Sequence, residues 1–247
     1  MDPVIQSLFR RKSVRAYADR DIAPGDKRLI LESAIQAPSA GNMNLYTILD
    51  ITDQTIKDRL AVLCDNQPFI AKAPMVLVFC PDYQRWYDVF RKHVDEVRLP
   101  AEGDLFLAFQ DTLIAAQNAV VAAESLGIGS CYIGDIMENF EEIRGLLGLP
   151  RYVLPMCMVV FGYPTGHQLE REKPPRFRVE DIVHENGYDM EKSSRMEEML
   201  SDRQGLSDTA DWIRRFCARK WNCEFSEEMS RSAAAMLKSW LGEQNNG

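Results

Sequence analysis

Pro74 opens a continuous apolar run, Met75-Val76-Leu77-Val78-Phe79-Cys80, and this run decides the fold. A run of this kind is typical of a strand that is buried on both faces of a sheet. Residues 46–51 and 155–161 predict two further strands, and segments with helical periodicity lie between the strands. The sequence therefore predicts an α+β or α/β layer fold in which one sheet is covered by helices.

Helices are predicted on either side of these strands. Asp2-Pro3 and Pro24 each open an amphipathic segment, and the second must end near Pro38, because the residue before a proline avoids the helical region. Residues 104–126 are apolar almost all round, which is typical of a helix buried on several sides, often by another subunit. Further helices are expected over residues 53–64, 83–99 and 138–149.

The last third of the chain has a different character. Residues 165–189 are polar, contain prolines and are expected to be extended, whereas residues from 190 onward regain helical periodicity with many aromatic and methionine side chains. We therefore expect a core over residues 1–188 and a helical extension over residues 189–247 that packs on the core or on a partner subunit. The Asn-Gly end of this extension is expected to fray.

Composition and charge narrow the function classes. The 247 residues carry a net charge of −8, which argues against nucleic acid as a partner. No segment has the features of a secretion signal or approaches the ~20 apolar residues of a membrane span, so no membrane partner is expected. The six cysteines form no CxxC pair and lie mostly in apolar runs, which indicates reduced thiols in a cytoplasmic protein. A zinc site at Cys217, Cys223 and His184 would lack the usual spacing and a fourth ligand.

Four polar stretches could carry chemistry. The first is a cluster of cations at the end of the first helix: Arg10, Arg11, Lys12, Arg15 and Arg20. The others are the small-residue loop 38–44, the glycine-containing segment 126–135 and the basic segment 173–178. Forked guanidinium donors suit phosphate, and small residues let a flat ligand approach the backbone. Each stretch also has a simpler interpretation. The cation cluster could be a solvated helix end, the small-residue loop an ordinary loop, and the basic segment a solvated linker.

No catalytic signature accompanies these stretches. The chain contains no GxSxG, P-loop or HExxH motif, and the glycines of residues 126–135 do not complete a GxGxxG pattern. What remains is a set of groups suited to a flat, polyanionic cofactor. Such a cofactor would itself carry the chemistry.

Taken in this order, the four stretches resemble the nitroreductase family, in its branch of oxygen-insensitive NADPH nitroreductases and FMN reductases. The resemblance runs from about residue 4 to residue 188, and more loosely to about residue 215. It implies an α+β fold with a central mixed β-sheet flanked by helices, and an interlocked homodimer with FMN at the subunit interface. The apolar helix 104–126 would then be the spine of the dimer.

The resemblance also implies the residues of the site. Arg11 would lie near the FMN phosphate, Arg15 near the pyrimidine edge of the flavin, and Arg203 near the phosphate of NADPH. Asp135 stands where the family commonly has a glycine, and Arg178 is an alternative to Arg176 because of an extra proline. The positions that match the family's FMN-binding residues are Arg11, Lys12, Ser13, Arg15, Ser39, Asn42, Gln67, Tyr132, Ile133, Gly134, Lys173 and Arg176.

The function implied by the resemblance is a ping-pong hydride transfer. NAD(P)H would pass hydride to FMN and leave, and a nitroaromatic or quinone-like acceptor would then take the hydride. No protein residue is expected to react, and Arg15 would give electrostatic support. The alternatives are a flavin reductase that supplies reduced FMN, a dehydrogenase for one metabolite, a non-catalytic flavin-binding protein whose Asp135 blocks the flavin, and an interaction module without a cofactor.

Overall fold

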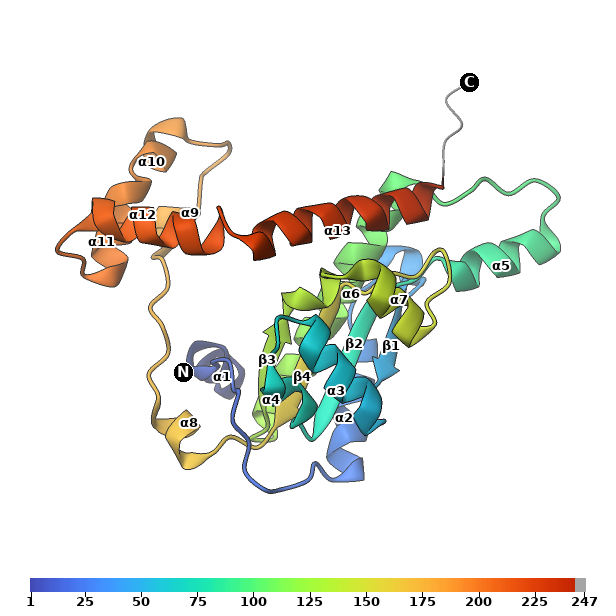
Figure 1. Cartoon of the computed structure of the whole chain (residues 1–247), viewed down its shortest axis with the longest axis horizontal. Helices are drawn as coiled ribbons and strands as arrows, with labels where there is room; N and C mark the ends of the chain where they lie inside the picture. Colours follow the sequence, from blue (N-terminus) through green and yellow to red (C-terminus); the bar gives the residue numbers. More distant parts are fainter. Residues whose placement is uncertain (243–247) are drawn as a thin grey trace. The chain divides into compact units, whose positions relative to one another are not determined.

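The computed structural model describes residues 1–242 (Figure 1). These residues divide into two compact units: unit 1 contains residues 1–171 and the stretch from Glu228 onward, and unit 2 contains Glu172–Glu227. The predicted division into a cofactor-binding core over residues 1–188 and a helical extension over residues 189–247 stays a prediction. The Asn-Gly end that is expected to fray lies outside the described residues.

Unit 1 is built on a four-stranded sheet with the strand order β1-β2-β4-β3. The strands are β1 (Tyr46–Asp50), β2 (Met75–Pro81), β3 (Gly129–Ile133) and β4 (Cys157–Gly162). Each neighbouring pair is antiparallel. A parallel bridge joins Ser13 to Ser130 and brings the chain after the first helix to the edge strand β3. The α+β class is therefore as predicted, and this bridge is the parallel part of the sheet.

Strand β3 corrects one expectation. The sequence predicts no strand in the glycine-containing segment 126–135, whereas residues 129–133 pair along their whole length with β4. Gly127 has a left-handed φ of 72° and follows the end of a helix, as a loop glycine does. Gly129 has another cause, because a Cβ there would come 2.5 Å from Val14 Cγ2. A glycine required by close packing thus has the same sequence signature as a loop glycine.

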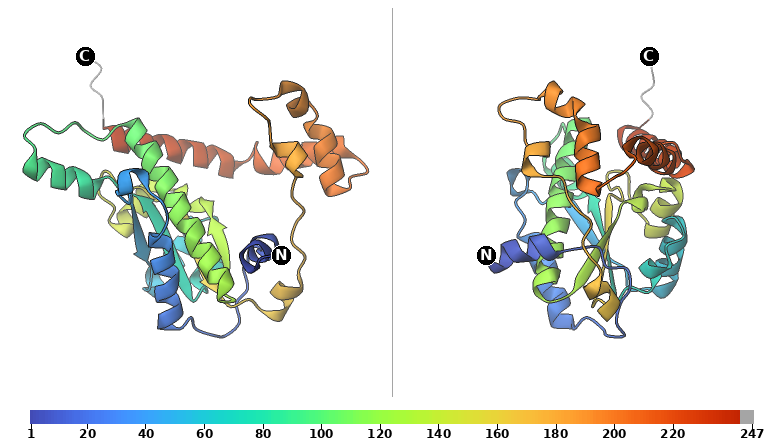
Figure 2. Two further views of the ribbon diagram at one scale, coloured as in Figure 1. Left: turned by 180° about the vertical axis from the view of Figure 1, so that it is seen from behind. Right: turned by 90° about the vertical axis from the view of Figure 1, so that its left-hand side faces the viewer.

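Helices cover both faces of the sheet (Figures 1 and 2). Side chains alternate along β2, so that Val76 and Val78 face one layer while Leu77 and Phe79 face the other. The first layer contains α3 (Gln54–Leu63), α4 (Pro68–Ala71) and α7 (Phe140–Leu147), and the second contains α2 (Pro24–Ile35) and α6 (Glu102–Ser125). Strand β2 therefore lies in the middle of a three-layer core, as its apolar run predicts.

Local signals determine where helices begin and end. α1 (Pro3–Arg10) begins where Asp2 Oδ1 accepts the Val4 N–H at 2.9 Å. α2 ends at Ile35, shortly before Pro38, as predicted. α5 (Gln84–His93) is shorter than predicted, because the backbone is extended at Val94. The stretch expected to be extended contains two short helices, α8 (Gly166–Glu170) in unit 1 and α9 (Val179–Ile182) in unit 2.

α6 has a buried side and an uncovered apolar side. Its 24 residues are long and apolar enough to cross a membrane by length and composition alone, which corrects the expectation that no segment approaches a span. One such helix is weak evidence of a membrane, because a core helix passes the same test. Ala115, Ala116 and Ala119 are fully buried in the core, whereas Phe106 is 58% exposed. The helix therefore packs on the sheet and leaves apolar side chains uncovered in a single protomer.

The C-terminal helices belong to both units. α10 (Met190–Ser194), α11 (Met196–Gln204) and α12 (Thr209–Lys220) lie in unit 2, and α13 (Glu224–Leu241) enters unit 1 at Glu228. In unit 1 Trp240 is fully buried, and its Nε1 donates to Ala101 O at 3.2 Å. The hydroxyl of Ser232, also fully buried, donates to Met137 O at 2.6 Å and accepts the Phe140 N–H at 3.1 Å. The end of α13 is thus part of the unit 1 core.

All six cysteines lie within the described residues, and none is in a disulfide. Four are buried: Cys64, Cys80, Cys131 and Cys157. Burial raises the pKa of the Cys64, Cys80 and Cys157 thiols, so these three stay un-ionised at neutral pH. Within residues 1–242 no three His, Cys, Asp or Glu side chains are grouped to hold a metal ion.

Candidate functional site

The first predicted binding run, residues 11–15, lies along the edge of the sheet. The Val14 N–H donates to Ser130 O at 2.9 Å, and Ser13 forms its parallel bridge to the same residue. Val14 is buried. Since side chains alternate along extended backbone, Ser13 and Arg15 point away from the side that Val14 packs on.

The chain after β4 holds the same run. Lys12 Nζ donates to Leu169 O at 2.7 Å and also to Arg171 O. Arg171 Nη2 donates in return to Ser13 O at 2.6 Å. Lys12 and Ser13, which are far from residue 171 in sequence, are therefore brought together with it by reciprocal hydrogen bonds. The Lys12 ammonium is bound by carbonyl oxygens and so acts as a tether of the run.

Arg11 carries an unsatisfied group in this region. Its Nη1 is buried and has no hydrogen-bond partner within residues 1–242, and the same is true of Arg171 Nε. The Arg11 guanidinium lies close enough to the Tyr132 phenol to oppose the rise in the Tyr132 pKa that burial causes. The Tyr132 hydroxyl donates to Gln117 Oε1 on α6 at 3.1 Å. Buried guanidinium nitrogens without acceptors are costly, so these two arginines fit an anionic group.

Arg15 lines a cleft together with the segment that follows Gln67. The Arg15 N–H donates to Gln168 Oε1 at 3.1 Å, and its guanidinium lies 5.8 Å from the centroid of the Phe69 ring. Gln67 Nε2 donates to Cys64 O at 2.8 Å, which closes the turn before α4. The cleft has a volume of about 620 Å³, and its lining residues are Arg15, Ala16, Tyr17, Ala18, Asp19, Pro68, Phe69 and Lys72.

The second predicted loop contains Ser39 and Asn42. Residues 40–42 form the 3₁₀ turn η1 (Ala40–Asn42), and Asn42 is exposed with a left-handed φ of 57°. Ser39 Oγ accepts a backbone N–H within the loop at 3.0 Å. The buried carboxylate of Asp111, on α6, accepts two further loop N–H groups. The structure therefore anchors this loop by a residue that sequence reasoning missed.

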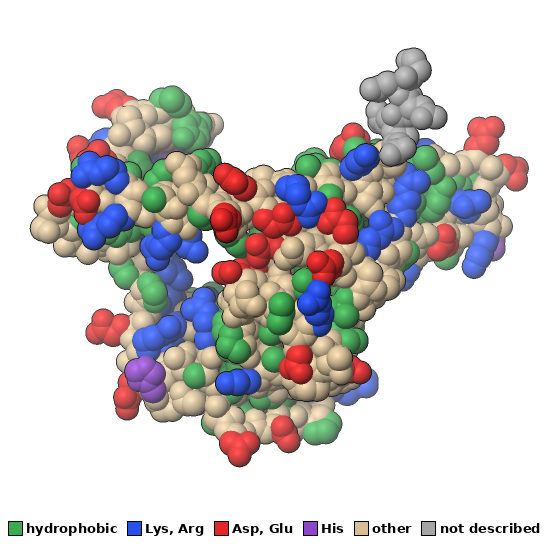
Figure 3. Space-filling view, in the orientation of Figure 1, with side chains coloured by type: hydrophobic (Ala, Val, Ile, Leu, Met, Phe, Trp, Pro, Cys, Tyr) green, Lys and Arg blue, Asp and Glu red, His purple; other side chains and the backbone are tan. Residues whose placement is uncertain are grey.

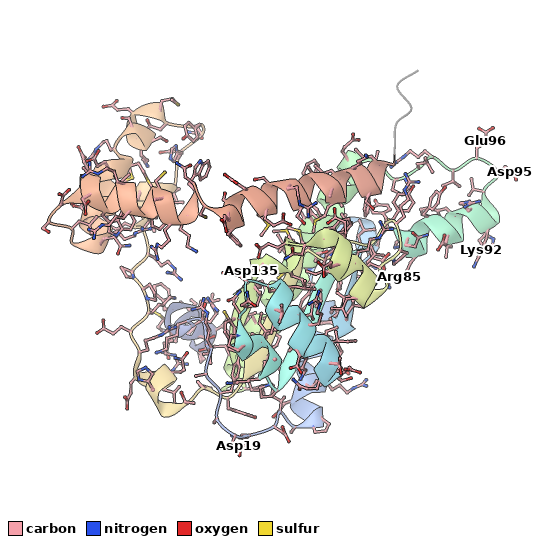
Figure 4. All side chains as sticks on the ribbon, viewed as in Figure 1. Asp19, Arg85, Lys92, Asp95, Glu96 and Asp135 are labelled. Atoms are coloured by element: carbon pink, nitrogen blue, oxygen red, sulfur yellow. The ribbon has the colours of Figure 1, made fainter. Side chains whose placement is uncertain are left out.

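The third predicted segment, Tyr132 to Gly134, ends β3 and begins the short helix η2 (Gly134–Met137). Asp135 lies at this end of β3, and η2 contacts α3 and α7 (Figure 4). Glu138 follows and is only 6% exposed. Burial raises the pKa of Glu138 to about 7, and three neighbouring carboxylates add to the rise. They belong to Asp135, Asp65 and Glu228.

The basic segment 173–178 begins unit 2. Arg178 forms ion pairs with Asp181 and Asp202, both at 3.3 Å. Arg176 Nη1 donates to the backbone oxygen of Pro174 at 3.2 Å. Two carboxylates thus already bind the Arg178 guanidinium, and Arg176 as the anion ligand stays a prediction.

Lys173 and Arg203 also belong to unit 2. The Arg203 guanidinium lies 4.0 Å from the centroid of the Phe177 ring, an arrangement that holds it on a flat apolar surface. The convergence of Lys173 and Arg176 with Arg11 on one phosphate stays a prediction, since the residues lie in different units.

Comparison with known proteins identifies the family. Residues 8–163 match the model of the Nitroreductase family. The chain belongs to the nitroreductase family. The oxygen-insensitive NADPH nitroreductase of Salmonella typhimurium is 32% identical over 205 residues, which is 82% of each chain. The FMN reductase (NADPH) of Bacillus subtilis is 31% identical over 77% of this chain and 76% of its own. The solved structure of B. megaterium NfrA2 has a TM-score of 0.80 at 28% identity, over 97% of this chain and 98% of that chain.

Membership of the nitroreductase family confirms the resemblance and the fold class, while the roles of single residues stay predictions. In the structure Lys12 and Ser13 both form hydrogen bonds with Arg171, and Arg11 lies near Tyr132. Sequence reasoning missed Arg171, although it stands only two positions before Lys173, where the predicted basic segment begins. That proximity in sequence was the available signal.

Proposed function

We propose that this member of the nitroreductase family is an FMN-dependent NAD(P)H oxidoreductase that passes hydride by a ping-pong mechanism to nitroaromatic or quinone-like acceptors. The observation that carries the proposal is the buried, unpartnered Nη1 of Arg11 beside Tyr132, at the edge of the sheet. Relatives named NADPH nitroreductase and FMN reductase support the same cofactor pair. FMN, when bound, would supply the two-electron chemistry, because it can accept hydride from NAD(P)H and pass it to the acceptor.

The residues of this chain would bind and orient the cofactor. Arg11, with Lys173 and Arg176, would neutralise the phosphate, because guanidinium groups form paired hydrogen bonds to phosphate oxygens. Arg15, at its cleft, would stabilise negative charge on the ring system. Arg203 would bind the additional phosphate that distinguishes NADPH from NADH. The remaining predicted contacts are Lys12, Ser13, Ser39, Asn42, Gln67, Tyr132, Ile133 and Gly134.

We also propose a homodimer in the cytoplasm. α1 lies against α6, and both helices expose apolar side chains, among them Val4 at 57% exposure and Phe106 at 58%. Apolar surface of this kind on neighbouring helices is typical of an interface. The free thiols support a reducing compartment.

The absorbance spectrum of the purified protein tests the cofactor. We expect flavin bands, bound FMN after titration, and bleaching of the bands by NAD(P)H without oxygen. Protein that stays colourless with added FMN would contradict the proposal. Bound flavin that NAD(P)H does not bleach would indicate a non-catalytic flavin-binding protein. Faster NAD(P)H oxidation with free FMN than with a quinone would indicate a flavin reductase.

Arg11→Ala tests the residue that carries the proposal. Loss of charge-assisted hydrogen bonds to a phosphate is expected to raise the Kd for FMN about tenfold or more. Arg10→Ala is the matched control, because Arg10 is an exposed cation at the end of α1, one position away. Fluorescence titration at constant ionic strength measures the Kd for FMN of both variants. Equal affinity of the two variants would show that Arg11 does not bind the cofactor.

A further inference from the structure

The loop of residues 39–45 has a left-handed backbone at three positions. Gly41, Asn42 and Asn44 have φ values of 56°, 57° and 49°. Glycine adopts this region freely, and asparagine adopts it at a smaller cost than most other residues. Such conformations persist where the surroundings fix them. The groups that fix this loop can be identified from its hydrogen bonds.

Asp111 holds both ends of the loop from α6. Its side chain is buried at 3% exposure, and its two carboxylate oxygens accept the Ala40 N–H at 2.9 Å and the Leu45 N–H at 3.1 Å. A buried carboxylate needs strong donors, and these backbone groups provide them. Asp111 therefore sets the distance between the two ends of the turn.

α5 holds the carbonyl groups of the same loop. Trp86 Nε1 donates to Met43 O at 2.8 Å. The Arg85 guanidinium donates to Asn44 O at 3.0 Å and to Tyr46 O. Arg85 lies at the start of α5 (Figure 4), and its Nε pairs with the buried Asp82 at 2.9 Å, which orients it. Side chains from two helices thus bind successive backbone groups of the loop.

We propose that Asp111, Arg85 and Trp86 are positioning residues, which hold the 39–45 loop in the conformation that presents Ser39 and Asn42 to the cofactor before it binds. This inference rests on the proposed function. None of the three side chains needs to touch FMN, because each acts through the loop backbone. A loop ordered in advance binds more tightly, since the cost of ordering it is not subtracted from the binding free energy.

Asp111→Asn tests the inference, with Thr112→Val as the matched control. The asparagine keeps the shape of Asp111 but turns one acceptor into a donor that faces a backbone N–H. Thr112 is the next residue of α6, is fully buried, and bonds within the helix to Ala108 O at 2.6 Å. Both variants lose one buried hydrogen bond, but only Asp111→Asn affects the loop. Trp86→Phe is a second test, because it removes the donor to Met43 and keeps an aromatic ring beside Phe90.

Three measurements distinguish positioning from general destabilisation: the Kd for FMN, the melting temperature, and amide hydrogen exchange of residues 39–45 in flavin-free protein. We expect Asp111→Asn to raise the Kd and the loop exchange rate about tenfold each, from the loss of a charged buried hydrogen bond. Trp86→Phe is expected to raise the Kd and the loop exchange rate about fivefold each, because the hydrogen bond that it removes joins neutral groups. Thr112→Val is expected to lower the melting temperature and leave the Kd and the loop exchange unchanged.

The outcomes separate the two proposals. Wild-type protein that binds no FMN would overturn the proposed function and the cofactor-positioning role with it. Wild-type protein that binds FMN, with Asp111→Asn and Trp86→Phe binding as tightly, would overturn the positioning role alone. The same holds if Thr112→Val weakens FMN binding as much as Asp111→Asn does.

Discussion

At the scale of single residues, Glu138 has surroundings that resist its ionisation. It is buried, its Oε2 has no hydrogen-bond partner in the described part of the chain, and the carboxylates of Asp135, Asp65 and Glu228 lie around it. Acidic side chains also gather on and below α13 in the view of Figure 3. The pKa of Glu138 is raised from 4.5 to about 7. The folded protein therefore retains this proton at a pH where the unfolded chain has lost it.

Glu138→Gln is expected to change how stability depends on pH. A raised carboxyl pKa gives stability that is present below pH 4.5 and is lost as the pH rises to about 7. Between pH 4.5 and 8 the free energy of unfolding should therefore fall by about 3 kcal/mol more in the wild type than in the variant. Urea unfolding at several pH values measures this difference, and Glu170→Gln on the exposed surface of α8 is the control. Parallel pH curves for wild type and Glu138→Gln would contradict the prediction.

The residues of the candidate site were predictable to different degrees. Arg11, Ser13 and Tyr132 stand in short segments whose order along the chain was informative, and the structure places Arg11 beside Tyr132. Asp111 could not be predicted, because its role depends on a loop some 70 positions earlier that only the fold brings to α6. A buried carboxylate in an apolar helix indicates a polar partner without naming it.

At the scale of helices and strands, periodicity predicted the elements with strong patterns. The buried strand β2 and the helices α2 and α6 agree with the sequence, and β2 is buried along its whole length, as its continuous apolar run predicts. β3 was missed because its first residue is a glycine required by Val14, and α5 was predicted too long because residues 94–99 keep a mixed polarity without being helical. A tertiary contact, which a local pattern does not contain, decided the first of these.

α13 offers a prediction at this scale. Met236 and Leu237 are consecutive residues of the helix, but Met236 is 4% exposed in the cluster with Trp240, whereas Leu237 is 40% exposed. Met236→Ala should lower the free energy of unfolding by about 3 kcal/mol and Leu237→Ala by less than about 1 kcal/mol, because only the first leaves a cavity. Denaturant unfolding of both variants measures the difference. Equal losses would mean that α13 does not pack on unit 1 through this face.

At the scale of the whole molecule, the uncovered apolar side of α6 predicts which surface forms the interface of the proposed homodimer. Ile114, on α6, is 41% exposed, and Val62, on α3 at the other face of the sheet, is 51% exposed. A charge placed in an apolar interface loses its hydration without a partner, so Ile114→Glu should weaken the dimer by a factor of about 100 or more. Val62→Glu adds the same charge to a surface outside the proposed interface and should leave the dimer intact. Sedimentation velocity measures both, and FMN titration shows whether the monomer still binds the cofactor. A wild-type monomer of 28.2 kDa with full affinity for FMN would show that one chain completes the site by itself.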